Sequence, residues 1–300
     1  MAIPLSQLKT WSTRPDRSRS AETYASIKRA LASSSRLNLY TYDVYLQGSY
    51  ANATNIRADS DVDIVVELTS IFRSDVSALT RLEKARYAAA YPDATRTLDD
   101  FRRDVLLALR DYYGSDAVSE GNKCLKVAGS GRRLPADVLV AQTYRVWHYF
   151  TESGERNYVE GVIFGTRDGR DVINFPKQHR SNGEKKQADT GDRYKPLVRT
   201  VKNARRVLVD DGVLTRDDAP SYFVECLLYN VTNGEFTGEL DQTYVNALIW
   251  LGEHFESFSA ALCQNGITKL FGNEPEQWDV QRAVRLITAL ARQWNEWGWK

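Results

Sequence analysis

The sequence is poor in the residues that build zinc sites and disulfide frameworks, with three cysteines and three histidines among 300 residues. Cys124, Cys226 and Cys263 are odd in number and far apart, which predicts buried free thiols rather than disulfides. The histidines are equally scattered along the chain, so we do not expect a zinc site.

Long apolar runs and an excess of charge of one sign are also lacking. No run approaches the roughly 18 residues that a membrane helix needs, and the N-terminal MAIPLSQLKTW lacks the basic and apolar regions of a signal peptide. Forty basic and 39 acidic residues leave a formal net charge of +1, which gives no reason to expect a constitutive nucleic-acid partner. We therefore expect a cytoplasmic protein with no membrane partner.

The first part of the chain mixes helical and strand patterns. Apolar spacing predicts helices over 20–35, 78–91 and 97–114. Alternation and β-branched residues predict strands over 40–47, 61–68, 123–129 and 132–145, and a hairpin over 158–176 that turns at Asp168-Gly169. Residues 177–191 are polar and predict a loop or a short helix.

The remaining sequence is mostly helical in pattern. The predicted helices span 192–210, 219–231, 241–263 and 276–297. We therefore expect an α/β (α+β) fold with a first lobe over residues 1–190 and a helical lobe over residues 191–300.

Two aspartates near a predicted strand are the first candidates for chemistry. Asp61 and Asp63 are separated by one residue, so on a strand both side chains project from the same face. Two ionised carboxylates that close together repel unless a cation lies between them, and Mg²⁺ prefers such oxygen ligands. The alternative is a polar-faced edge strand without a metal.

A third carboxylate and a glycine turn strengthen the metal hypothesis. Asp137 stands alone in the apolar run LPADVLV, where an unpaired carboxylate is costly to bury; a surface position or pairing with a nearby arginine is the alternative. Gly48-Ser49 ends the preceding strand, and a glycine there lets the backbone approach a phosphate. Together these residues indicate a site for two metal ions and a nucleoside triphosphate.

This constellation resembles the signature of the polymerase-β-type nucleotidyltransferases: a Gly-Ser turn, an Asp-x-Asp pair and a distal third Asp. More narrowly, LQGSYANATNIRADSDVDIVVEL resembles the cGAS/DncV-like nucleotidyltransferases (CD-NTases) of bacterial anti-phage signalling systems. INFPKQH, DRYKPLVRTVKNARRVL and PSYFVECLLYNV extend the resemblance over about residues 20–290, most strongly to the CdnE branch. The Gly-Thr that often follows the Gly-Ser turn in this family is replaced by Ala53-Thr54.

The resemblance implies a nucleotidyltransferase lobe with a mixed sheet, a helical C-terminal lobe and an active site in the cleft between them. It implies that Asp61, Asp63 and Asp137 are catalytic and bind two Mg²⁺ ions, for which Mn²⁺ can substitute. Asp137 would also align the acceptor hydroxyl. The implied substrate contacts are Gln47, Gly48, Ser49, Asn174, Arg199, Lys202, Ser221 and Tyr222.

The resemblance also assigns roles to these substrate contacts. Gly48, Ser49 and Ser221 would bind the donor triphosphate, and Lys202, with Arg199 nearby, would neutralise it. Tyr222 would stack on a base. For the two cations a solvated helix face is the alternative, and for Tyr222 it is core packing.

Asn174 interrupts an apolar strand, and its amide can donate to and accept from a base edge. Family members that select uracil resemble this sequence in carrying an Asn near that place, which suggests a preference for uridine. The substrates expected are ribonucleoside triphosphates, namely UTP, ATP or both.

The function expected from the resemblance is synthesis of a cyclic oligonucleotide second messenger, a cyclic dinucleotide that can contain uridine, read by a downstream effector. Another nucleotidyltransferase of the superfamily, acting on RNA ends or small molecules, is one alternative. A non-catalytic nucleotide sensor is the other.

Overall fold

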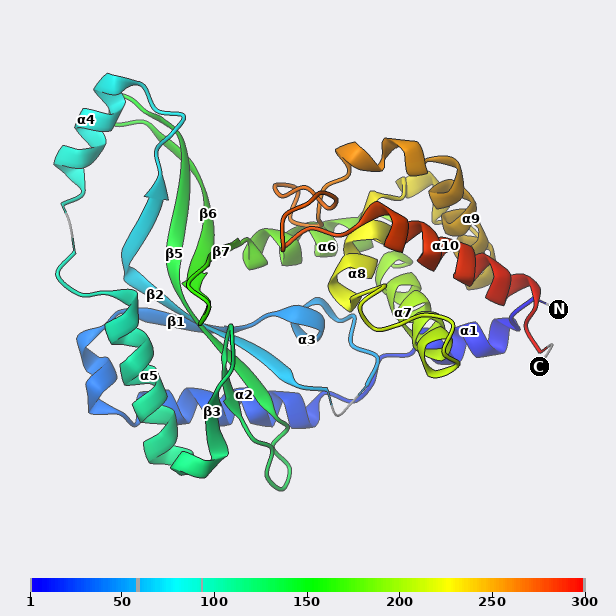
Figure 1. The fold of residues 1–300 in the computed structure, drawn as a ribbon, viewed down its shortest axis with the longest axis horizontal. Coiled ribbons are helices and arrows are strands. Elements are labelled where there is room, and N and C mark those ends of the chain that lie inside the picture. Colours follow the sequence, from blue (N-terminus) through cyan, green and yellow to red (C-terminus); the bar gives the residue numbers. More distant parts are fainter. Residues whose placement is uncertain (1, 58–59, 93, 299–300) are drawn as a thin grey trace. The chain divides into compact units, whose positions relative to one another are not determined.

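The computed structural model describes residues 2–57, 60–92 and 94–298, and the chain divides into two compact units (Figure 1). The sheet unit comprises residues 16–50 and 58–176. The helical unit comprises residues 1–15, 51–57 and 177–300, so its long segment begins earlier in the chain than the predicted boundary near residue 190. The difference arises because the polar stretch after residue 176 forms a helix that buries His179 and Lys186 in the helical unit, where Lys186 donates to the Val231 oxygen.

The described residues of the sheet unit form one mixed, seven-stranded sheet in the order β1-β2-β5-β4-β3, and β6 and β7 extend it from β5. The strands are β1 (Tyr42–Leu46), β2 (Val62–Asp75), β3 (Val118–Glu120), β4 (Leu125–Val127), β5 (Ala136–Phe150), β6 (Arg156–Gly165) and β7 (Asp171–Asn174). Strands β2 and β5 run parallel, and the other pairs are antiparallel. The predicted strands and the hairpin turn at Asp168-Gly169 are confirmed.

Strand β2 alternates between two differently packed faces. Val62, Ile64 and Val66 are buried in a core that includes Phe101 and Leu109. That core is covered by helices α2 (Ser18–Ala32) and α5 (Leu98–Tyr113), which contact each other. Because side chains alternate along a strand, the odd-numbered positions of β2 point to the opposite face.

Helix α5 begins and ends where the sequence predicts. Thr97 and Asp100 form a capping box at its start, and the chain leaves the helix at Gly114, which has a φ of 90°. Helix α4 (Arg81–Ala90) begins with a second capping box, formed by Thr80 and Glu83.

The helical unit is built from helices that pack around its own core. They are α1 (Leu5–Ser12), α6 (Pro176–Asp189), α7 (Tyr194–Asp210), α8 (Ser221–Asn230), α9 (Leu240–Glu253) and α10 (Val280–Asn295). Leu197, Tyr244 and Leu286 are fully buried in this core, and Trp294 and Trp297 pack against it. Among the described residues, no helix has the length and apolarity that a membrane crossing requires.

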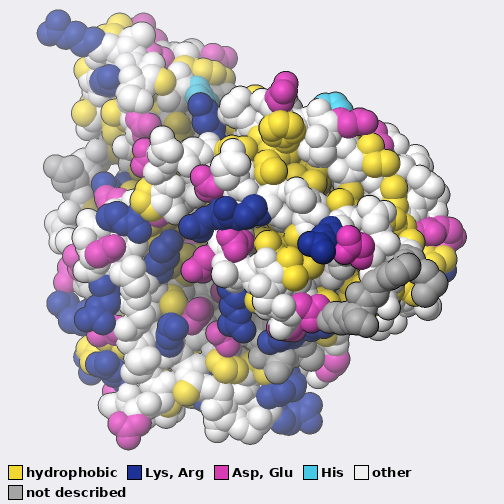
Figure 2. All heavy atoms as spheres, turned by 45° about the vertical axis from the view of Figure 1, so that its right-hand side comes forward, with side chains coloured by type: hydrophobic (Ala, Val, Ile, Leu, Met, Phe, Trp, Pro, Cys, Tyr) yellow, Lys and Arg dark blue, Asp and Glu magenta, His cyan; other side chains and the backbone are white. Residues whose placement is uncertain are grey.

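The remaining elements are short. Helix α3 (Gly48–Asn52) follows β1, and the 3₁₀ helices are η1 (Ser35–Leu39), η2 (Ser115–Ala117), η3 (Asn233–Glu235) and η4 (Phe255–Ala260). The helix predicted over 241–263 therefore ends at Glu253 and is followed by η4. Positive and negative side chains are interspersed over the face drawn in Figure 2.

Candidate active site

Two of the three predicted catalytic carboxylates lie directly opposite each other in the sheet. Asp63 on β2 is the register partner of Asp137 on β5. Asp61 is exposed and lies one residue before the start of β2. In the part of the chain that the structure describes, no group of three or more His, Cys, Asp or Glu side chains is arranged to hold a metal ion. The structure thus brings Asp63 and Asp137 together, and among the described residues Asp61 does not complete a set of three ligands with them.

The chemistry of this carboxylate pair fits a divalent cation whose coordination shell is completed by other ligands. Two ionised carboxylates on neighbouring strands repel each other, and a cation between them removes the repulsion. Mg²⁺ is commonly held by one or two carboxylates together with waters and substrate phosphates rather than by a full protein cage. Asp63 and Asp137 would supply the protein share of such a site.

The Cys124 thiol lies close enough to Asp63 and Asp137 for their charges to change its pKa. Burial, together with the negative charges of Asp137 and Asp63, raises the pKa of the Cys124 thiol to about 12. Both carboxylates thus act on one nearby atom. Sequence reasoning missed two neighbours of the aspartates. Lys126 on β4 is the register partner of Asp137, and Cys124 directly precedes β4. Only the pairing of β4 with β5 places these residues near the aspartates.

Gly48 lies against one of these carboxylates. Its φ is 64°, in the left-handed region that glycine favours, and it begins helix α3. A Cβ atom at this position would overlap with Oδ2 of Asp63 and lie 3.0 Å from its Cγ. The backbone N–H of Gln47 donates to the backbone oxygen of Asp63 (3.0 Å), which fixes the turn. Ser49, the next residue after Gly48, is half-buried.

A buried polar cluster follows on the same face of β2. Glu67 is fully buried; its Oε2 accepts from Tyr45 Oη (2.8 Å) and its Oε1 from Thr143 Oγ1 (2.7 Å). Because these partners come from the strands on either side, the cluster ties β1, β2 and β5 together next to the aspartates.

Asn174 ends β7 with its amide oriented. Its Oδ1 accepts from the Phe175 backbone N–H (2.8 Å), so Nδ2 is the group turned to donate elsewhere. Gly161 on the neighbouring β6 allows the close approach of this segment, since a Cβ there would lie 2.6 Å from the Asn174 backbone oxygen.

The two predicted phosphate-binding cations are buried in the helical unit rather than solvated. Arg199 on α7 is 9% exposed; its Nε donates to the Ser12 oxygen (2.5 Å) and its Nη1 to the Ala53 oxygen (2.6 Å). Burial, with a contribution from neighbouring Arg14, lowers the pKa of Arg199 to about 10. The alternative of a solvated helix face is therefore wrong for Arg199.

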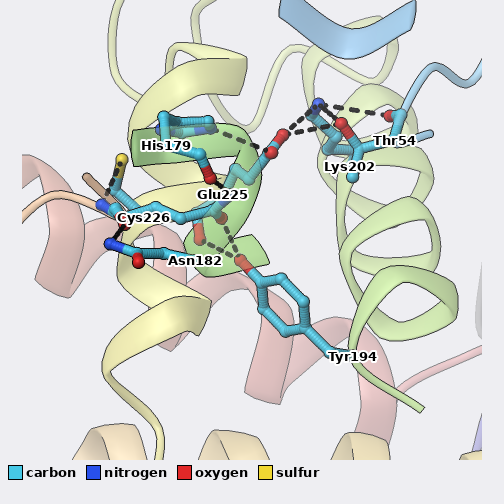
Figure 3. A network of polar contacts seen from close by, with 8 residues as sticks. Thr54, His179, Asn182, Tyr194, Lys202, Glu225 and Cys226 are labelled. Carbon is cyan, nitrogen blue, oxygen red and sulfur yellow. Dashed lines mark hydrogen bonds and ion pairs between the residues drawn. The ribbon is translucent and has the colours of Figure 1, made fainter. Parts of the chain in front are cut away.

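Lys202 is 3% exposed and belongs to a network that Figure 3 shows. Its Nζ donates to the Thr54 oxygen (3.2 Å), to Thr54 Oγ1 (3.4 Å) and to Glu225 Oε2 (3.2 Å). Sequence reasoning missed Glu225; the signal was an acidic residue inside the apolar run FVECLL of α8.

Ser221 and Tyr222 begin helix α8. Ser221 is exposed at the first helical position, where backbone N–H groups favour an anion. The Tyr222 side chain is 41% exposed, and its ring stacks on that of His179 with centroids 5.4 Å apart. Core packing thus accounts for only part of the environment of Tyr222, because 41% of its surface remains in contact with solvent.

Comparison with known proteins gives a consistent result. Residues 181–295 match the family model of the cGAS/DncV-like nucleotidyltransferase C-terminal helical domain. The chain is 41% identical to the cyclic UMP-AMP synthase of Rhodothermus marinus, over 99% of this chain and 100% of that protein. It is 36% identical to the cyclic nucleotide synthase CdnE01 of Staphylococcus haemolyticus, over 99% and 100% of the two chains.

Solved structures agree over nearly the whole chain. The Rhodothermus marinus CdnE c-UMP-AMP synthase, solved with Apcpp and Upnpp, has a TM-score of 0.89 at 40% identity, covering 99% of this chain and 98% of that one. The Elizabethkingia meningoseptica CdnE cyclic dinucleotide synthase, solved with GTP and Apcpp, has a TM-score of 0.76 at 30% identity, covering 99% of both chains.

Proposed function

Because the chain belongs to the cGAS/DncV-like nucleotidyltransferases, and within them to the CdnE branch, we propose that it synthesises a cyclic dinucleotide from ribonucleoside triphosphates. The observation that carries the proposal is the pairing of Asp63 with Asp137, with Gly48 closed against Asp63. We further propose that the product is a second messenger in bacterial anti-phage defence, made in the cytoplasm and read by a separate effector.

In the proposed reaction the 3′-hydroxyl of one nucleotide attacks the α-phosphate of a bound triphosphate and releases pyrophosphate. Repetition of the step between the joined nucleotides closes the ring. Asp61, Asp63 and Asp137 would hold two Mg²⁺ ions, or Mn²⁺, and the ions would neutralise charge on the phosphates. Asp137 would align the attacking hydroxyl, and Gly48 and Ser49 would hold the donor triphosphate through backbone and hydroxyl donors.

Further residues would complete nucleotide binding. Gln47 lies directly before the phosphate turn, and Ser221 would donate to the same phosphates. Lys202 and Arg199 would supply positive charge to the triphosphate, and Tyr222 would stack on a base. These roles place most of the rate enhancement in positioning and charge stabilisation.

We also propose that the enzyme accepts UTP at one position and ATP at the other. The oriented Asn174 Nδ2 can donate to a carbonyl oxygen, which uracil has and adenine lacks. Replacing Asn174 by Ser should therefore reduce UTP incorporation relative to ATP. An unchanged ratio would contradict the assignment.

The decisive experiment separates the products of all four α-³²P-labelled ribonucleoside triphosphates, with Mg²⁺, by thin-layer chromatography after phosphatase treatment. A phosphatase-resistant product that the double variant Asp61→Ala, Asp63→Ala does not make would support the proposal. Omitting one nucleotide at a time would identify the bases. Extension of a labelled RNA primer would favour an RNA-end enzyme instead, and nucleotide binding without pyrophosphate release would favour a sensor.

A further inference from the structure

The Glu225 carboxylate is the centre of a buried polar network in the helical unit. It is 3% exposed and accepts hydrogen bonds from three different segments. Thr54 Oγ1 and Lys202 Nζ approach Oε2 at 2.7 and 3.2 Å, and His179 Nε2 approaches Oε1 at 3.2 Å. Figure 3 shows these side chains converging on the carboxylate.

The charges of this network depend on one another. Burial alone would raise the pKa of Glu225, but the positive charge of Lys202 and the hydrogen bonds from His179 and Thr54 lower it to about 2. A buried ion pair from which one partner is removed leaves an uncompensated charge in the interior. The carboxylate is therefore the ion-pair partner of a lysine that is only 3% exposed.

Glu225 and Thr54 together determine where the Lys202 ammonium lies. All three hydrogen bonds of Nζ described above go to these two residues, and Thr54 itself donates to the carboxylate. The three side chains form a closed triangle, so loss of one of them removes a hydrogen-bond partner from each of the other two.

The other oxygen of the carboxylate holds the His179 ring. That ring stacks on Tyr222 with an interplanar angle of 23°. One carboxylate thus supports both a side chain proposed to meet the triphosphate and, through His179, a side chain proposed to meet a base.

We propose that Glu225 is a positioning residue for nucleoside triphosphate binding: it holds Lys202 in place for the phosphates and, through His179, the Tyr222 ring for the base. This inference rests on the proposed function, since it takes the roles of Lys202 and Tyr222 from it. Glu225 itself does not contact the reacting atoms.

The test is a double-mutant cycle on the binding of inorganic tripolyphosphate, which carries the phosphates without a base. Glu225→Gln and Lys202→Met should each weaken tripolyphosphate binding about tenfold, the scale of one lost charge-assisted hydrogen bond. Because Glu225 acts through Lys202, the double variant should bind no more weakly than the weaker single variant. The double variant also lacks both buried charges, so it should fold even where a single variant does not.

Several controls separate positioning from general damage. Glu253→Gln removes an exposed carboxylate of the same unit and should leave the Kd unchanged. Thr54→Ser keeps the hydroxyl that donates to Glu225, so it should bind tripolyphosphate several times more tightly than Thr54→Val. With UTP as substrate, Glu225→Gln should raise KM more than it lowers kcat. The reason is that the contact of Lys202 with the triphosphate stabilises the bound substrate as well as the transition state.

Multiplicative losses in the double variant would overturn the inference, as they would mean that Glu225 acts independently of Lys202. Tighter tripolyphosphate binding by Glu225→Gln would also overturn it, since the carboxylate would then compete with phosphate for the lysine. Failure of the proposed function would look different: the unmodified protein would make no cyclic product, whatever the variants bind.

Discussion

Gly48 and Asp63 are packed so closely that no side chain fits between them. The contact depends on two properties of one residue, because Gly48 both adopts a φ of 64° and leaves room for the Asp63 carboxylate. A Cβ atom would meet Asp63 Oδ2 and Cγ, so a larger residue must move either the turn or the carboxylate.

Replacing Gly48 by Ala should therefore reduce kcat/KM for nucleotide incorporation by at least about 100-fold, the scale expected when a catalytic group is displaced by about 1 Å. Initial rates of pyrophosphate release would measure it. Gly131→Ala is the matched control, because Gly131 has a similar φ of 58°, but a Cβ atom there would meet no atom of the described residues within 4 Å. That variant should lose stability from backbone strain and keep activity. Equal losses of activity in both variants would mean that strain, not the contact with Asp63, is responsible.

The second prediction concerns the paired charges of Asp63 and Asp137. Replacing Asp137 by Asn removes a like-charge pair, so the metal-free variant should unfold at a higher temperature than the unmodified protein. Its free energy of unfolding should be higher by a few tenths to about 1 kcal/mol. Activity should fall at least about 100-fold, since Mg²⁺ loses a ligand. Thermal unfolding with and without Mg²⁺ checks this: Mg²⁺ should stabilise the unmodified protein and the control variant Asp116→Asn, but not Asp137→Asn. Equal stabilisation of all three would place the ion elsewhere.

Much of the fold follows from local patterns in the sequence. The capping residue Thr97 and the stop at Gly114 give both ends of α5, and the alternation of Val62, Ile64 and Val66 gives the buried face of β2. The continuation of β2 to Asp75 was not predictable, because it depends on pairing with β5 across a shift of register.

The residues of the candidate site can be recognised from local patterns to the same degree. The carboxylates and the glycine turn are adjacent in sequence or lie in apolar strands, so they stand out locally. The buried Lys202 contacts Glu225, 23 positions away in the sequence, and Thr54, 148 positions away. No local sequence pattern indicates contacts between residues so far apart. The division of the chain has the same cause, since residues 51–57 belong to the helical unit through long-range hydrogen bonds.

The third prediction concerns the departure from the family pattern at Ala53. This residue has a φ of 61°, in the left-handed region where a Cβ atom is strained and glycine is not. Ala53→Gly should therefore raise the free energy of unfolding by up to about 1 kcal/mol, the relief of strain exceeding the added entropy of the unfolded chain. Urea unfolding would measure it. Ala85→Gly, in the middle of α4, should lower the free energy of unfolding instead; destabilisation by both substitutions would show that Ala53 is not strained.

Lys186 on α6 is a buried lysine whose Nζ contacts oxygen atoms and aromatic rings. It is 8% exposed, and its Nζ donates to the Val231 oxygen (2.6 Å) and to Asn233 Oδ1 (3.0 Å). The Nζ also lies 5.2–5.9 Å from the ring centroids of Tyr194, Tyr229 and Phe236. Burial lowers the pKa of Lys186 to about 8, and the negative charge of Asp189 only partly opposes this.

This shift predicts how stability changes with pH. Between pH 8 and the ordinary lysine pKa of 10.5 the unfolded chain binds the Lys186 proton more tightly than the folded protein does, so the free energy of unfolding should rise with pH in that range. Relative to Lys186→Met, which has no proton to lose, the unmodified protein should gain up to about 3 kcal/mol from pH 7 to pH 10. Urea unfolding of both proteins at several pH values measures the difference, in which the titration of other groups cancels. A constant difference would mean that the rings and oxygen acceptors hold the ammonium as firmly as water does.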